Sequence, residues 1–125
     1  MRELLLGRGH ELAEVDEALE RLEAIGELDD ARFARRYAED KRELRGWGPE
    51  RIREALGSRG VPSELIEAAL GADDHGGQVE RAVALLRGRN QDLDDERGRG
   101  RALAYLTRRG YDYELAYEAI RVASG

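Results

Sequence analysis

The side chains that most often carry catalysis are sparse in this 125-residue chain. It has no cysteine, which excludes disulfides and thiolate metal sites, and its two histidines are His10 and His75. No glycine-rich loop carries a phosphate-binding lysine. The run Asp73-Asp74-His75 offers three potential metal ligands, but no second motif supplies more, so we interpret it as a solvated turn with a helix cap. The sequence therefore predicts a protein that is not an enzyme and that holds no metal or cofactor.

Arginine is the residue type with the most evident binding chemistry. The chain has 21 basic residues, and Lys41 is the one lysine among them. The planar guanidinium group binds phosphates and carboxylates through two parallel hydrogen bonds. A GC-rich genome, which favours arginine codons, would explain the excess equally well. The candidate contact residues for a protein partner or for DNA are Arg32, Arg35, Arg36, Arg42, Arg45, Trp47, Arg51, Arg97, Arg101, Arg108 and Arg109.

The charges are distributed unevenly along a chain whose net charge is −6. Residues 1–31 hold three arginines and ten acidic residues, a balance of −7. Residues 32–59 and residues 81–109 are the two basic stretches, each with a balance of +4. The acidic total argues against a simple nucleic-acid binder, whereas the two basic stretches favour a localised binding surface.

Each basic residue also has a simpler interpretation. Arg35 and Glu39 stand four residues apart, and such pairs often decorate a solvated helix at a gain of only about 0.2–0.5 kcal/mol. Trp47 lies in a glycine-flanked turn, where it either contacts a partner or caps the core of its module. The clustering of nine basic residues within residues 32–59 favours the functional interpretation.

A repeat of about 50 residues organises the chain. Gly9, Gly60 and Gly110 are 51 and 50 residues apart, and in each copy an alanine and a large aliphatic residue follow nine and ten positions later. A repeat of this length is typical of stacked helical units. In each copy we expect a helix to end at the glycine, in the left-handed conformation, and the next helix to start near Pro62 or Asp112.

Helical periodicity and capping residues place the other elements. Gly71–Gly77 is predicted to be a loop, and the pairs Asp29-Asp30 and Asp94-Asp95 are predicted to stand at helix starts. After a helical segment within residues 1–25, helices are expected near 29–44, 49–58, 62–70, 78–87, 94–108 and 112–122. The sequence thus predicts an elongated all-α fold of tandem three-helix repeat modules, with about seven to eight helices.

The same pattern predicts the division of the chain and its cores. Residues 1–26 are expected to be the remnant of a first module without its opening helix or helices, followed by modules at 27–72 and 76–125. Phe33, Ala34, Tyr37 and Leu44 are expected on the buried face of the helix near 29–44. The expected core of the second module is Phe33, Tyr37, Ile52, Leu56, Leu65, Ile66 and Leu70. That of the third module is Leu85, Leu103, Leu106, Leu115 and Ile120.

The central motifs resemble those of the RecX regulatory proteins. Leu28-Asp29-Asp30, Arg32-Phe33-Ala34 and Tyr37 match the Leu-Asp-Asp-x-Arg-Phe-Ala pattern and the tyrosine that follows it. The run from Gly46 to Ile52, then Leu56 and Arg59-Gly60-Val61, match the next family positions at the same spacing. Arg109-Gly110-Tyr111 is similar to the family's C-terminal module.

This resemblance implies a regulator, usually an inhibitor, that binds the filament formed by RecA on single-stranded DNA and so modulates recombination, DNA repair and the SOS response. It also implies tandem three-helix repeats. An alternative is a DNA-binding protein of tandem three-helix modules that acts without RecA, and a third is a protein-interaction repeat with no DNA role. The sequence has neither a secretory signal nor a membrane-length apolar run, so we expect a cytoplasmic protein, acting as a monomer.

Overall fold

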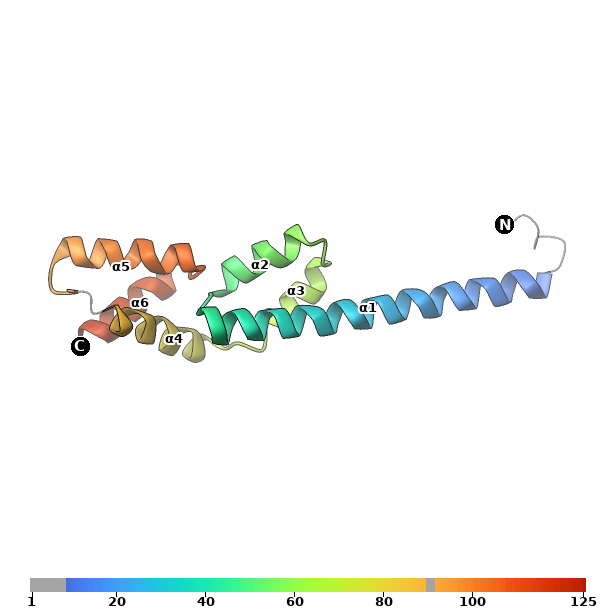
Figure 1. Cartoon of the computed structure of the whole chain (residues 1–125), viewed down its shortest axis with the longest axis horizontal. Coiled ribbons are helices and arrows are strands. Elements are labelled where there is room, and N and C mark those ends of the chain that lie inside the picture. The colour runs from blue at the N-terminus through green and yellow to red at the C-terminus, as the bar shows by residue number, and fades with distance from the viewer. Residues whose placement is uncertain (1–8, 90–91) are drawn as a thin grey trace.

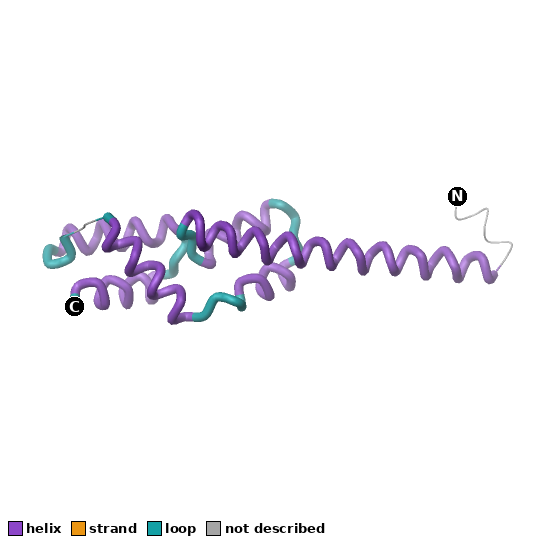
Figure 2. The backbone as a smooth tube through the Cα atoms, turned by 60° about the horizontal axis from the view of Figure 1, so that its bottom comes forward, coloured by secondary structure: helices purple, strands orange, loops and turns teal. Residues whose placement is uncertain are grey.

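The computed structural model describes the backbone of residues 9–89 and 92–125. Six helices make up this part of the chain, and no strand occurs in it, which confirms the all-α class (Figures 1 and 2). The helices are α1 (Gly9–Arg45), α2 (Pro49–Ser58), α3 (Ser63–Leu70), α4 (His75–Gly88), α5 (Glu96–Arg109) and α6 (Tyr113–Ser124). None of the described helices combines the length and the apolar character that a bilayer span requires.

Helix α1 differs most from the expectation. A single 37-residue helix replaces a helical segment ending near residue 25 and a second helix starting near Asp29, so the described residues hold six helices rather than seven or eight. Asp29 and Asp30 therefore do not begin a helix. Gly26 does not break α1 because a glycine inside a helix costs only about 1 kcal/mol, and strong helix formers flank it. The N-terminal part of α1 projects beyond the other helices and makes the fold elongated (Figure 1).

The C-terminal part of α1 packs with α2 and α3 to form one core. Ile52, Leu56, Ile66 and Leu70 are buried there as predicted, and Tyr37 and Leu65 pack against them half-buried. Helix α1 buries small side chains: Ala34 and Ala38 have no exposed surface. Their small size lets the axis of α1 approach the neighbouring helices closely.

The prediction of burial is wrong for two residues of α1. Phe33 is 44% exposed and Leu44 is 79% exposed. At about 100° per residue, Phe33 and Leu44 lie about 100° and 80° from Ala34 in the same direction around the helix, at one flank of the face that Ala34 and Ala38 bury. The prediction was correct for Ala34, which is fully buried, and for Tyr37, which is half-buried; the helix buries Ala38 beside Ala34 in place of the larger Phe33 and Leu44.

Helices α4 and α5 pack on α6 around a second core. Leu106, Leu115 and Ile120 are buried in it, and Leu85 and Leu103 pack against it half-buried, in line with the predicted set. We refer to the two bodies as the α1–α3 module and the α4–α6 module. The division of the sequence into residues 1–26, 27–72 and 76–125 stays a prediction.

The repeated turns have the predicted geometry. Gly60 and Gly110 have φ angles of 81° and 105°, the left-handed region in which glycine avoids the steric cost of a Cβ. Asp112 caps α6, because the backbone N–H of Leu115 donates to its Oδ1 at 2.8 Å. The predicted loop over Gly71–Gly77 is shorter than expected: the Asp74 carboxylate accepts the N–H of Gly77 at 2.7 Å and starts α4 at His75.

Candidate partner-binding surface

The two basic stretches of the sequence meet where the two modules touch. The Arg109 guanidinium donates to the backbone carbonyl of Arg45, at the end of α1. The Arg51 guanidinium, on α2, lies 3.5 Å from the carbonyl oxygen of Arg108, at the end of α5. The members of the first pair are 64 positions apart in the sequence and those of the second pair are 57 positions apart. Four of the predicted contact residues are therefore neighbours at one junction.

Close backbone contact makes this junction possible. The N–H of Gly48 donates to the carbonyl of Arg109 at 2.8 Å, and the N–H of Glu50 donates to that of Gly110 at 2.9 Å. A Cβ on Gly48 would stand 2.5 Å from the Gly110 oxygen. The two glycine-containing turns, residues 46–48 and 109–111, can approach this closely only because neither carries a side chain at the contact.

Trp47 holds two of the cations of this junction in place. Its ring is half-buried against the core of the α1–α3 module. The guanidinium carbon of Arg51 lies 4.3 Å from the ring centroid and Nζ of Lys41 lies 5.0 Å from it. Because these cations already lie against the ring, the structure favours the interpretation in which Trp47 caps its module and positions them.

The structure adds basic residues that the sequence prediction had left out. Arg59 stacks on the Tyr37 ring at 4.8 Å, and Tyr37 in turn lies 6.4 Å from the Trp47 ring. Lys41 could have been found from its position four residues after Tyr37, on the same face of a helix. Arg59 has no such local signal, because it arrives from the far end of α2.

Helix α5 presents a basic stripe next to the junction. Arg97, Arg101 and Arg108 are exposed, and at about 100° per residue they lie within about 40° of one another around the helix axis. Arg109 points elsewhere: it is half-buried, and its guanidinium lies 5.4 Å from the Tyr105 ring and donates to the Tyr105 hydroxyl. Of the predicted contact residues in the second basic stretch, these three have exposed side chains that a partner could reach.

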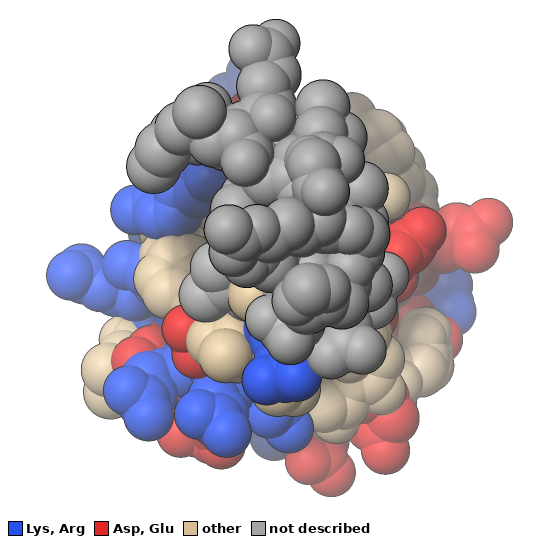
Figure 3. Space-filling view, turned by 90° about the vertical axis from the view of Figure 1, so that its right-hand side faces the viewer, with Lys and Arg blue, Asp and Glu red and all other residues tan. Residues whose placement is uncertain are grey.

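On α1, Arg32, Arg35 and Arg36 are exposed. Arg32 and Arg36 stand one turn apart and, with Asp29 and Phe33, line a shallow depression of about 250 Å³. Seen along the projecting end of the molecule, basic side chains gather mainly on one flank and acidic side chains on the other (Figure 3). The acidic stretch at residues 1–31 falls largely outside the described side chains.

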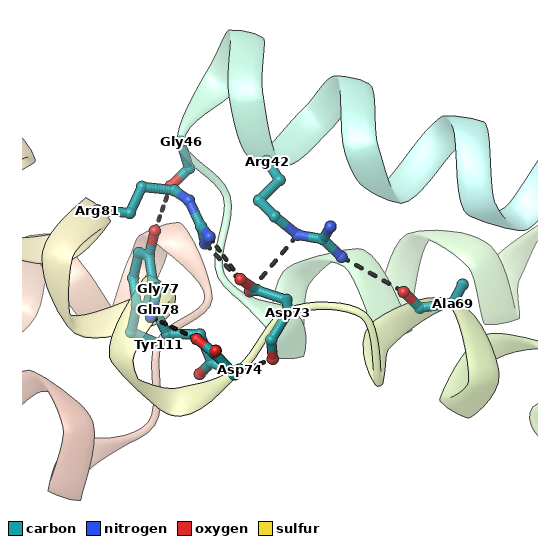
Figure 4. A network of polar contacts seen from close by, with 9 residues as sticks. All are labelled: Arg42, Gly46, Ala69, Asp73, Asp74, Gly77, Gln78, Arg81 and Tyr111. Atoms are coloured by element: carbon teal, nitrogen blue, oxygen red, sulfur yellow. Dashed lines mark hydrogen bonds and ion pairs between the residues drawn. The ribbon is translucent and has the colours of Figure 1, made fainter.

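Two basic residues of the first stretch are used inside the fold. Arg42 has only 12% of its side chain exposed; its Nε lies 3.4 Å from Asp73 Oδ2, and its Nη2 donates to the carbonyl of Ala69 (Figure 4). Arg53 makes two hydrogen bonds to the Glu67 carboxylate, at 2.8 and 3.0 Å, which tie α2 to α3. This pairing raises the pKa of Arg53 and lowers the pKa of Glu67. Neither guanidinium is free for a partner.

The residues considered as a metal site are separately engaged. Asp73 pairs with two arginines, Asp74 caps α4, and Nε2 of His75 lies 3.1 Å from the Glu118 carboxylate. Among the side chains that the structure describes, no three histidine or acidic groups are placed together as a metal ion would need. The interpretation of this run as a solvated turn was right for the cap and wrong for Asp73, whose side chain is 7% exposed.

The geometry defines an elongated all-helical repeat protein with an arginine-rich junction between two modules. Comparison with known proteins identifies the family within this class. Residues 29–70 match the family described as "RecX, second three-helix domain". A regulatory protein RecX of Thermus thermophilus is 40% identical over 111 residues, covering 89% of this chain and 71% of that protein. One from Mycobacterium avium is 35% identical, covering 82% of this chain and 61% of its own length.

The fold agrees with these sequence matches. The crystal structure of RecX from Lactobacillus salivarius superposes with a TM-score of 0.71, covering 92% of this chain and 75% of that chain at 21% sequence identity. The chain belongs to the RecX family of regulatory proteins.

Proposed function

We propose that this chain regulates RecA by binding the filament that RecA forms on single-stranded DNA. Membership of the RecX family supports a regulatory role, and the resemblance of its motifs to that family implies RecA as the partner. The observation that carries the proposal on this molecule is the junction, where arginines of two distant basic stretches meet on one surface. Such a surface suits an acidic partner or a nucleoprotein filament.

The proposed contact surface consists of residues with exposed or positioned cationic groups. Its centre is the junction formed by Arg45, Arg51, Arg108 and Arg109, and it omits Arg42, whose side chain is only 12% exposed. The full set is Arg32, Arg35, Arg36, Lys41, Arg45, Arg51, Arg59, Arg97, Arg101, Arg108 and Arg109, with Trp47 as a support. We propose that the chain acts by binding rather than by turnover, in line with its membership of a family of regulatory proteins.

The experiment is a charge reversal on α5 with a matched control. Arg101→Glu with Arg108→Glu reverses two exposed arginines next to the junction. Arg87→Glu with Arg121→Glu changes the net charge equally at exposed positions on α4 and α6. Binding to RecA assembled on single-stranded DNA, and inhibition of its ATPase, are measured over a range of salt concentrations.

We expect the first pair to weaken filament binding strongly and to make the dependence of log affinity on log salt shallower, because fewer charge contacts remain. The control pair should bind nearly as tightly as the wild type. Equal loss in both pairs would show only a net-charge effect and would place the interface elsewhere. A wild-type chain that binds bare single-stranded DNA as tightly as the filament would instead favour the alternative of a DNA-binding protein that acts without RecA.

A further inference from the structure

A buried carboxylate bridges the two modules. Asp73 lies in the short link between α3 and α4, and its side chain is 7% exposed. The Arg81 guanidinium, on α4, donates to both of its oxygens, at 2.6 and 3.1 Å. Arg42, on α1, approaches the same carboxylate at 3.4 Å. Figure 4 shows the two guanidinium groups converging on Asp73 from the two modules.

A second polar contact crosses the same joint. The Tyr111 hydroxyl, which belongs to the α4–α6 module, donates to the carbonyl of Gly46 at the end of α1, at 2.9 Å. Its side chain is 2% exposed, so this bond is shielded from water. Gly46 itself has a φ of 67°, and a Cβ there would stand 3.0 Å from the side chain of Leu85 on α4. The two modules are thus held by directional bonds as well as by apolar packing.

Directional bonds of this kind determine orientation more than they determine stability. A buried ion pair gains little net free energy, because the cost of desolvating its charges offsets their attraction. It does require a specific geometry, here a bidentate one at Arg81. The orientation that Asp73 enforces is the one in which Arg51 and Arg108 lie side by side at the junction.

We propose that Asp73 is a positioning residue for filament binding: by joining Arg42 to Arg81 it fixes the two modules so that their arginines bind the filament as one continuous surface. This inference rests on the proposed function. Two contact surfaces held at the correct separation bind with a high effective concentration, and a loose joint loses that gain without the loss of any contact residue.

The test uses Asp73→Asn in the full chain, with Asp74→Asn as its matched control. Both variants remove one negative charge, and asparagine still caps α4 at position 74. Simple electrostatics would strengthen the binding of either variant to a nucleoprotein filament. We expect Asp73→Asn to bind the RecA filament at least tenfold more weakly, with a shallower salt dependence, although every arginine is retained. Asp74→Asn should bind at least as tightly as the wild type.

A stability control separates positioning from partial unfolding. Ile66→Val weakens the core of the α1–α3 module without touching the joint, so it should leave filament affinity unchanged at temperatures where helical content is intact. Small-angle scattering should show a broader range of module orientations in Asp73→Asn than in Ile66→Val. If Asp73→Asn fails to fold, Arg81→Lys keeps the positive charge but loses the pairing of one guanidinium with both oxygens of Asp73, so it must also weaken binding and flatten the salt dependence.

The outcomes are distinct for the two proposals. A wild-type chain that does not bind the filament would overturn the proposed function. A wild-type chain that binds, together with folded Asp73→Asn or Arg81→Lys that binds with unchanged affinity and salt dependence, would overturn the role of Asp73 alone.

Discussion

Gly60 and Gly110 offer a direct test of the module joint, because they are equivalent positions of the repeat in different surroundings. Both have positive φ angles, 81° and 105°. A Cβ on Gly60 would meet nothing within 4 Å. A Cβ on Gly110 would stand 2.5 Å from Arg51 Cβ and 2.6 Å from Arg51 N, across the junction. Replacing each with alanine therefore separates the cost of the backbone conformation from the cost of disturbing the joint.

The expected magnitudes follow from these surroundings. Gly60→Ala should lower the free energy of unfolding by about 1–2 kcal/mol, the cost of placing an L-residue in the left-handed region. Gly110→Ala adds the displacement of α2 backbone, at about 1–3 kcal/mol for an overpacked site. It also strains the hydrogen bond from Glu50 to the Gly110 carbonyl, whose net value is about 1 kcal/mol. The total is roughly 3–6 kcal/mol.

Urea denaturation followed by circular dichroism measures both values under the same conditions. We expect Gly110→Ala to cost at least about 1 kcal/mol more than Gly60→Ala, the lower bound of the overpacking term. Filament affinity should fall for Gly110→Ala and stay near the wild-type value for Gly60→Ala. Equal losses of stability in the two variants would refute the close contact between residues 46–51 and 108–111 on which the junction depends.

Three further predictions concern the core, the buried arginine and the buried tyrosine. Leu56→Ala should lower the free energy of unfolding by about 2–5 kcal/mol, because Leu56 has no exposed surface; a thermal or urea melt showing a loss under about 0.5 kcal/mol would contradict the packing of α2. Arg42→Glu should lower the free energy of unfolding by about 3–5 kcal/mol, because it places a second carboxylate against Asp73. Arg35→Glu, at an exposed position, should change it by less than about 0.5 kcal/mol. Equal melting temperatures for the two variants would be inconsistent with the burial of Arg42. Burial raises the pKa of the Tyr111 hydroxyl to about 12, although the positive charge of Arg81 acts to lower it. The unfolded chain, whose tyrosine pKa is about 10, therefore releases this proton at lower pH than the folded protein does. The free energy of unfolding should fall by up to about 2–3 kcal/mol as the pH rises from 10 to 12. Tyr111→Phe should lack this loss between pH 10 and 12, and an identical pH profile in both proteins would exclude Tyr111 as its source.

Local sequence signals were sufficient for most of the helices. Pro49 begins α2, Gly60 and Gly110 take the left-handed conformation, and Asp112 caps α6 through its own side chain. Each of these features depends on residues within about four positions of one another, so the sequence contains the whole interaction. The core of α2, α3 and α6 was predictable for the same reason, because apolar residues at helical spacing share one face.

The face and the length of α1 required information from outside the helix. Periodicity placed Phe33 and Leu44 on the buried face together with Ala34. Packing against α3 kept Ala34, added Ala38 and left the two larger residues exposed, because small side chains allow closer approach. Asp29-Asp30 has the composition of a helix start, yet the helix continues through it. A cap competes with helix propagation at a difference of only about 1 kcal/mol, so the sequence pattern alone does not decide between them.

The candidate binding surface shows the same division. Sequence alone determined that the chain carries two basic stretches, that it lacks cysteine, and that its motifs match the RecX pattern. Only the tertiary structure decided which arginines a partner can reach: it buried Arg42 against Asp73 and brought Arg51 to Arg108. The physical reason is that charge and helical periodicity are properties of neighbouring residues, whereas burial and ion pairing depend on chain segments that meet only when the two modules pack together.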